Sequence, residues 1–344
     1  MTSGARQPID RRRRERPIDT AGYSAELRDM LIDTDLRAIK LTHFGDSQQS
    51  NDLRELPNSG GYGRIHHFSS DEGSDWPANP LPIEPACRAL GIDIPTSMNA
   101  QVFQSSGCNW RCWYCYVPFE DLTGRRGAHV TVRAMVDGYL ALDDRPRVVD
   151  LSGGQPDLTP EWPVWFLTEL RDRGIDDCYV WSDDNLSTDY LWRYVSEDDR
   201  ALLDEHANYG RACCLKGYDE HSFAFNTKAS PNDFSTQFEL LDRLRNATNI
   251  DFYVYVTFTA PSIDDGLAKR VGQFVDRLQS VSPTLPLRTV PLKVLEWGPV
   301  GPRLNNDRRA ALHNQHEVVR LWQHELEDRF SPVERQLSIV DIPK

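Results

Sequence analysis

From about residue 100 onward, short β-rich segments alternate with helical ones, and this alternation restricts the fold more than any other feature of the sequence. Strands separated by helices favour a parallel sheet built from βα units. Pro286 and Pro291 remove ladder donors from the last strand, so we place it at a sheet edge. The pattern predicts an α/β fold with an open partial (βα)6 barrel. The six candidate strands are 100–105, 147–152, 178–183, 211–216, 251–259 and 287–295.

The fifth candidate strand indicates that the two faces of the sheet differ. Alternate side chains of a strand point to opposite faces. We expect one set to pack under helices and the other to face a polar cavity. The first set is apolar and the second carries hydroxyl groups: Phe252, Val254, Val256 and Phe258 against Tyr253, Tyr255, Thr257 and Thr259.

The flanking regions predict less regular structure. Residues 1–20 include Arg11 to Arg14 and few apolar side chains, so we expect a disordered basic tail. In the extension over 21–99, apolar spacing predicts a helix from Ser24 to about Lys40, and Gly, Pro and Ser predict an irregular covering segment over 43–95. The core follows over 100–297. A C-terminal helical extension over 298–344 contains a helix predicted from Asn305 to Arg329.

Composition and charge restrict the partners. With 52 acidic and 39 basic residues the net charge is -13, which argues against nucleic acid as a partner. The arginine-rich tail nevertheless leaves a transfer-RNA substrate as a further option. The sequence has no apolar run long enough for a membrane span and no secretory signal, so we expect a cytoplasmic protein with no membrane partner. Seven cysteines in such a compartment favour thiols that act as ligands or as small buried residues.

Three cysteines lie in one loop directly after the first candidate strand. Cys108, Cys112 and Cys115 have the spacing C-x3-C-x2-C, and soft sulfur ligands select zinc, copper(I) or an iron–sulfur cluster. A structural zinc ion needs a fourth ligand, and no Cys or His follows at zinc-finger spacing. A four-iron cluster held by three thiolates leaves one iron open to a substrate or cofactor. A zinc site that uses a distant ligand, or buried thiols without metal, are the alternatives.

This loop resembles the cysteine loop of the radical S-adenosylmethionine (SAM) superfamily. In that family, three cysteines of a C-x3-C-x-aromatic-C loop hold a four-iron four-sulfur (4Fe-4S) cluster whose open iron binds the amino and carboxylate groups of SAM. Cys108, Cys112 and Cys115 match those cysteines, and Tyr114 occupies the aromatic position. The resemblance covers about residues 100–297 and implies a radical SAM core, one 4Fe-4S cluster, SAM, and an external electron donor of the flavodoxin or ferredoxin type.

The second candidate strand ends in a further motif of this family. Ser152-Gly153-Gly154-Gln155-Pro156 resembles the GGE-type element that receives the SAM amino group. Glycines permit the close backbone approach that such a turn requires. Gln155 stands where Glu is usual, which retains a carbonyl acceptor but removes a charge.

The third and fourth candidate strands end in polar residues with implied cofactor contacts. Ser182 and Asn185 could reach ribose hydroxyls, with a helix cap or Asx-turn as the alternative. Cys214-Leu215-Lys216 resembles the Asp-Leu-Lys element of glycyl-radical activating enzymes, which implies that Lys216 approaches the SAM carboxylate. Cys214 replaces the Asp. Its thiol is a candidate hydrogen-atom donor, with a small buried residue as the alternative.

The resemblance implies an enzyme that cleaves SAM reductively and uses the 5′-deoxyadenosyl radical to abstract hydrogen from a substrate. The motifs are closest in style to glycyl-radical activating enzymes, which favours a peptide or protein substrate over a small molecule. A non-catalytic iron–sulfur or zinc-binding redox protein is the alternative of a different class. A second cluster is disfavoured because the remaining thiols contain no C-x2-C pair: Cys87, Cys178, Cys213 and Cys214.

Overall fold

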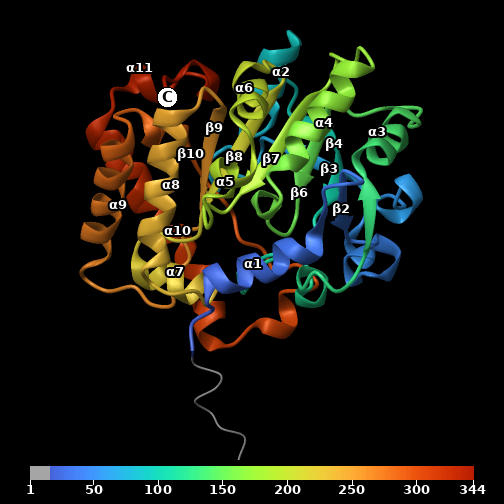
Figure 1. The fold of residues 1–344 in the computed structure, drawn as a ribbon. Coiled ribbons are helices and arrows are strands. Elements are labelled where there is room, and N and C mark those ends of the chain that lie inside the picture. Colours follow the sequence, from blue (N-terminus) through green and yellow to red (C-terminus); the bar gives the residue numbers. More distant parts are fainter. Residues whose placement is uncertain (1–15) are drawn as a thin grey trace, which may run out of the picture.

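A seven-stranded sheet that curls into an open half-barrel organises the molecule (Figure 1). The computed structural model describes residues 16–344, so most of the predicted basic tail lies outside the described residues. The strand order is β10-β9-β8-β7-β6-β4-β3, and all neighbouring pairs are parallel except β3 with β4. The strands are β3 (Gly63–Ser69), β4 (Ser97–Gln104), β6 (Val148–Ser152), β7 (Tyr179–Asp184), β8 (Tyr209–Leu215), β9 (Asp251–Val256) and β10 (Thr289–Pro291).

The six predicted parallel strands and the open α/β architecture are confirmed. The last strand lies at the sheet edge, as its prolines predict, but it is shorter than 287–295 because a 3-10 helix occupies Leu285–Arg288. The strand β3 is an unpredicted seventh member within the segment 43–95. It pairs antiparallel with β4 at the opposite edge, where its side chains are mostly half-buried, so its sequence carries no apolar alternation.

Helices cover one face of the sheet, which we call the outer face. Side chains cap two of these helices: the Ser196 hydroxyl accepts from the Asp199 amide, and Asn305 caps the predicted C-terminal helix in the same way. The helices after β4 are α3 (Val132–Leu140), α4 (Glu161–Asp172), α5 (Tyr190–Tyr194), α6 (Glu197–Glu205), α7 (Glu220–Thr227), α8 (Asp233–Ala247), α9 (Leu267–Val281), α10 (Asn306–Arg329) and α11 (Pro332–Arg335).

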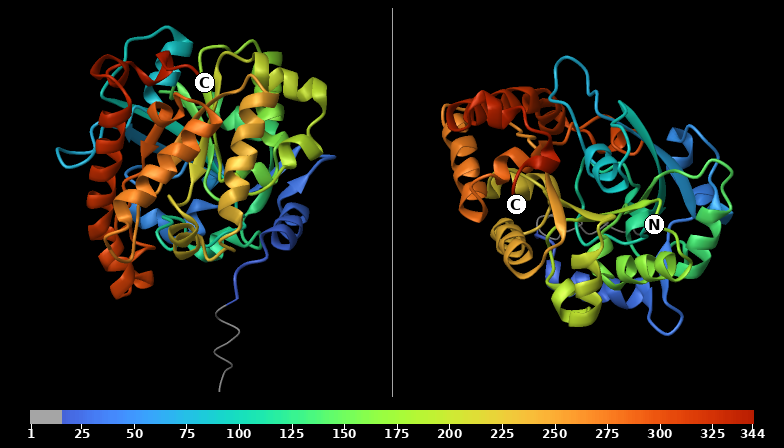
Figure 2. Two further views of the ribbon diagram at one scale, coloured as in Figure 1. Left: turned by 90° about the vertical axis from the view of Figure 1, so that its left-hand side faces the viewer. Right: turned by 90° about the horizontal axis from the view of Figure 1, so that it is seen from above.

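The opposite, inner face of the sheet is divided along the strands. Near the amino ends it is apolar, because α2 (Ile83–Leu90) and the C-terminal segment pack there against Trp181 and Tyr253 (Figure 2). Phe252, Val254 and Val256 belong to the outer core, as the alternation of this strand predicts. The polar part of the inner face is therefore restricted to the carboxyl ends of the strands.

The N-terminal extension differs from its prediction. The helix α1 (Thr20–Leu31) ends nine residues before Lys40, because a turn at Thr34–Arg37, with Arg37 at φ 47°, reverses the chain. Residues 38–41 then form a strand in which Ile39 and Leu41 are buried. A small antiparallel sheet results, with the order β1 (Ile32–Asp33), β2 (Ala38–Leu41) and β5 (Ala128–Thr131). None of the described helices combines the length and the apolar character that crossing a membrane requires.

Candidate functional site

The cysteine loop follows β4 at the carboxyl edge of the sheet and is held by backbone hydrogen bonds at both ends. The Cys108 amide donates to the carbonyl of Leu122 at 3.1 Å. The Arg111 and Trp113 amides donate to the carbonyls of Thr227 and Asn226, each at 3.1 Å, at the end of α7. Because both partners lie in ordered elements, the loop is a fixed scaffold rather than a mobile connection.

Two tryptophans between the cysteines anchor the loop. Trp110 and Trp113 are each 1% exposed and pack into the outer core. The Trp110 indole donates to the Thr20 hydroxyl at 3.0 Å, and the Trp113 indole donates to the Asn226 side chain at 3.0 Å. A buried indole with a satisfied N–H fixes the backbone on either side of it. Along the loop, the cysteines thus alternate with buried tryptophans that fix the backbone.

The three loop thiols share one electrostatic environment. Burial raises the pKa of each thiol, that of Cys112 to about 12, and the neighbouring thiols Cys108 and Cys115 raise the Cys112 value further. Lys216 opposes the rise for all three cysteines, so all three lie within range of a single cation. Metal binding requires the thiolate form and would displace these protons.

The donor chemistry of the loop fits an iron–sulfur cluster. Among residues 16–344, no group of three or more His, Cys, Asp or Glu side chains is arranged to hold a single metal ion. In a four-iron cluster each thiolate binds a different iron. The loop offers three soft donors, all desolvated, beside a cation that would offset the negative charge of thiolates.

The glycine turn after β6 packs directly against the start of the cysteine loop. Gly153 and Gly154 have φ of 64° and 66°, which is the left-handed region that favours glycine. A Cβ on Gly154 would collide with the carbonyl oxygen of Gly107 and lie 2.7 Å from that of Ser105. The Gln155 amide donates to the same Gly107 carbonyl at 2.7 Å. The turn and the loop therefore form one unit.

The side chain of Gln155 already has partners within the protein. Its amide group donates to the Asp184 carboxylate at 2.9 Å, and its carbonyl accepts from the Asn185 amide at 2.9 Å. The residue is 1% exposed. The structure thus places Gln155 at the predicted turn, where its side chain joins two strand ends.

Asn185 and Ser182 lie in different surroundings, although the sequence predicts that both reach the ribose hydroxyls from the end of the third candidate strand. The Asn185 side chain donates to Asn109 of the cysteine loop at 2.9 Å, while its buried Oδ1 has no hydrogen-bond partner among the described residues. Ser182 lies on the outer face, where its hydroxyl bonds to that of Tyr209 at 2.9 Å. The structure brings Asn185 to the loop and leaves Ser182 among the helices.

Lys216 brings the remaining predicted residues together. Burial alone would lower its pKa, but Cys214, Tyr114, Cys112 and Asp183 raise it well above its ordinary value. The Tyr114 hydroxyl bonds to that of Thr257 at 2.9 Å, which joins the loop to the residue after β9. Burial also raises the pKa of Cys214 to about 12, so at neutral pH this residue is a protonated thiol.

The sequence analysis missed two carboxylates on the inner face, Asp150 of β6 and Asp183 of β7. Burial raises the pKa of Asp150 well above its ordinary value and that of Asp183 to about 6. Strand alternation carries the signal that would have found Asp183, because this residue continues the row of Tyr179 and Trp181 on the inner face.

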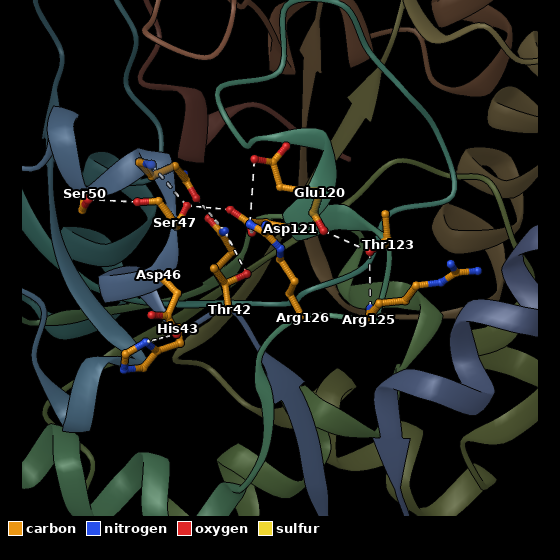
Figure 3. Close-up of polar contacts among 12 residues, drawn as sticks. Thr42, His43, Asp46, Ser47, Ser50, Glu120, Asp121, Thr123, Arg125 and Arg126 are labelled. Atoms are coloured by element: carbon orange, nitrogen blue, oxygen red, sulfur yellow. Dashed lines mark hydrogen bonds and ion pairs between the residues drawn. The ribbon is translucent and has the colours of Figure 1, made fainter.

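The covering segment holds the chain that leaves the cysteine loop. The Ser47 hydroxyl donates to the Asp121 carboxylate at 2.6 Å, and Arg126 lies 3.4 Å from its other oxygen (Figure 3). Burial raises the pKa of Asp121, and both hydrogen bonds oppose the rise. Closer to the cysteines, the Arg303 guanidinium donates to the carbonyls of Cys115 and Val117 at 2.6 and 2.9 Å. Segments distant in sequence thus fix the loop.

No protein-family model matches the sequence, and a search of curated proteins finds no match. Among solved structures, the chain overlaps with SuiB from Streptococcus suis bound to S-adenosylmethionine, at 12% identity and a TM-score of 0.37. The overlap covers 52% of this chain and 37% of SuiB, so the chain spans little more than a third of the length of that protein.

Two further structures overlap with the chain. TYW1 with a lysine–pyruvate adduct bound overlaps at 13% identity and a TM-score of 0.42, over 78% of this chain and 84% of TYW1. Native anSMEcpe with bound AdoMet and a Cp18Cys peptide overlaps at 16% identity and a TM-score of 0.37, over 51% of this chain and 45% of that protein. Overlaps at these identities and TM-scores assign no family to the chain. The candidate site is therefore described from the residues of this chain alone.

Proposed function

We propose that the protein is a radical SAM enzyme, which cleaves S-adenosylmethionine reductively and uses the resulting 5′-deoxyadenosyl radical to abstract hydrogen from a substrate. One observation carries the proposal: the cysteine loop, the Gly153–Gly154 turn and Lys216 meet at the carboxyl edge of the sheet. Open parallel sheets bind their ligands at this edge.

Each part of the site has a separate task in this proposal. Cys108, Cys112 and Cys115 hold a 4Fe-4S cluster, which would supply the electron that splits the sulfonium–carbon bond of SAM. Lys216 pairs with the SAM carboxylate. The backbone of the Gly153–Gly154 turn accepts hydrogen bonds from the SAM amino group.

The residues between these elements orient the cofactor and exclude water from it. Asn185 presents its unpartnered Oδ1 toward a ribose hydroxyl. Tyr114, 8% exposed and bonded to Thr257, keeps the loop closed on the sheet side. Water exclusion protects a reactive radical from side reactions. Cys214, as a protonated thiol on the inner face, is positioned to return a hydrogen atom to a substrate radical.

The proposal leaves the substrate at the level of a class. The Cys214-Leu215-Lys216 element supports a peptide or protein substrate, with a small molecule as the competing class. The electron comes from a separate donor of the flavodoxin or ferredoxin type. If instead the loop binds zinc or an inert cluster, the protein is a non-catalytic redox or metal-binding protein.

Product formation separates these functions. After anaerobic reconstitution with iron and sulfide, the protein mixed with SAM and dithionite should release 5′-deoxyadenosine. Cys112→Ala should lose both the cluster absorbance and this product. Cys178→Ala is the matched control, because Cys178 is also buried but lies in the outer core, away from the cysteine loop. A Cys112→Ala variant that keeps its cluster, or a wild-type protein that forms no 5′-deoxyadenosine, would contradict the proposal.

A further inference from the structure

Two buried carboxylates on the inner face have no ion-pair partner. Asp150 is 5% exposed, and its Oδ1 has no hydrogen-bond partner among the described residues. Asp183 lies beside it on β7 and is half-buried. Within residues 16–344, neither carboxylate has a Lys, Arg or His nitrogen within 4 Å, since the ion pairs of that region involve other acids. Buried charges are normally paired.

The outer face of the same strands provides an internal comparison. Asp157 and Asp184 are also buried and also close together, but Arg211 lies between them at 3.1 and 3.2 Å. That acidic pair is neutralised within the protein. The inner pair lacks an equivalent cation, so its unpaired state is not a general feature of this sheet.

The nearest inner-face cations do not fill this role. Lys216 lowers the pKa of Asp183, and Arg64 lowers that of Asp150, in both cases against the larger effect of burial. Both act from beyond ion-pair distance. In the proposed function Lys216 is also engaged by the SAM carboxylate, so it is not available to pair with Asp183.

An aromatic ring completes the surroundings of the pair. Tyr116 follows the last loop cysteine, is 36% exposed, and has Asp183 and Asp150 among the charges that act on its hydroxyl. The face of a tyrosine ring attracts cations. The Arg64 guanidinium already lies over this ring, 5.8 Å from its centre, so binding of an ammonium group would depend on the two carboxylates.

We propose that Asp150 and Asp183 bind a protonated amine of the substrate and so hold the substrate beside the cofactor site. This assignment rests on the proposed function, because only an enzyme has a substrate to bind here. It restricts the substrate to one that carries an aliphatic ammonium group. The two aspartates are binding residues, and a bound ammonium group would supply the cation that this pair lacks among the described residues.

Binding of butylammonium chloride, measured by calorimetry on the reconstituted protein with SAM, tests the assignment. Butanol is the neutral probe of matched size. The variants Asp150→Asn and Asp183→Asn keep the side-chain shape but remove the charge, and Asp172→Asn is the control at an exposed acid. We expect wild type and the control to bind butylammonium and not butanol, and each inner variant to bind it about ten- to a hundredfold more weakly.

Two further readouts separate this assignment from a structural role and from the proposed function. Removal of an unpaired buried charge should leave the melting temperature of Asp150→Asn unchanged or raised, whereas a structural role requires a loss of stability. Without substrate, 5′-deoxyadenosine should form equally in wild type and in the control variant Asp172→Asn. If wild type makes this product but does not prefer butylammonium to butanol, the assignment alone fails. Absence of the product in wild type overturns the proposed function instead.

Discussion

At the scale of single residues, the site depends on charges that burial makes unfavourable. Burial raises the pKa of the three loop thiols and of both inner aspartates, whereas the neighbours of Lys216 raise its pKa against the effect of burial. The electrostatic effects of these groups on one another are large because burial weakens the screening by water. Functional sites commonly combine such groups, at a cost in stability.

Lys216→Met tests the cation shared by the loop cysteines. The substitution keeps the length of the side chain and removes its charge. We expect SAM to bind about ten- to a hundredfold more weakly, while iron content stays the same, because the ammonium group pairs with the SAM carboxylate and not with iron. Equilibrium dialysis with labelled SAM measures the effect, and Lys269→Met, at an exposed lysine, is the control. Unchanged SAM affinity would refute the role of Lys216.

Asp183 predicts a pH dependence of stability. Burial raises its pKa from the ordinary 3.8 to about 6, so the folded state holds the proton more tightly than the unfolded state. The contribution of Asp183 to stability is therefore full below about pH 4 and is lost as the pH rises toward 6. Compared with wild type, Asp183→Asn should become relatively more stable across this interval. Urea unfolding at a series of pH values measures the difference, and a constant difference would contradict the buried position of this carboxylate.

At the scale of elements, the turn after β6 joins the sheet to the cysteine loop. Gly154→Ala should disturb this contact, because the new methyl group would meet the carbonyl oxygens of Gly107 and Ser105 in a backbone conformation that favours glycine. We expect the variant to fold with a lower melting temperature and to lose most SAM cleavage. Gly174→Ala is the control, since Gly174 also has positive φ but nothing within 4 Å of the new Cβ. Equal activity of both variants would contradict the contact.

Elements with strong periodicity could be predicted from the sequence, and those defined by their partners could not. The six parallel strands and α10 carry repeating apolar patterns, so their predicted positions hold to within a few residues. The strands β3 and β2 depend on pairing with segments farther along the chain, which no local pattern records. Likewise, Cys108, Cys112 and Cys115 can be recognised in the sequence by their spacing. Asp150 can be recognised only in the structure, because what distinguishes it is an Oδ1 without a hydrogen-bond partner among the described residues.

At the scale of the whole molecule, the extension and the core together enclose the inner face. The Trp76 indole of the covering segment donates to the Pro291 carbonyl of β10 at 3.1 Å, and Lys293 donates to the Glu72 carbonyl at 2.7 Å. These contacts join the segment after β3 to the strand at the opposite edge of the open sheet (Figure 2). The half-barrel is thus completed by a segment rather than by further strands.

The central claim is that three thiolates of one loop hold an iron–sulfur cluster with one iron open to SAM. Electron paramagnetic resonance of the reconstituted, dithionite-reduced protein tests this claim most directly, because the signal of a reduced cluster changes when a ligand binds its open iron. We predict the spectrum of a reduced 4Fe-4S cluster that shifts when SAM is added and does not shift with 5′-methylthioadenosine, which lacks the amino and carboxylate groups that bind the open iron. A spectrum that SAM leaves unchanged, or a protein that takes up zinc in place of iron, would contradict it.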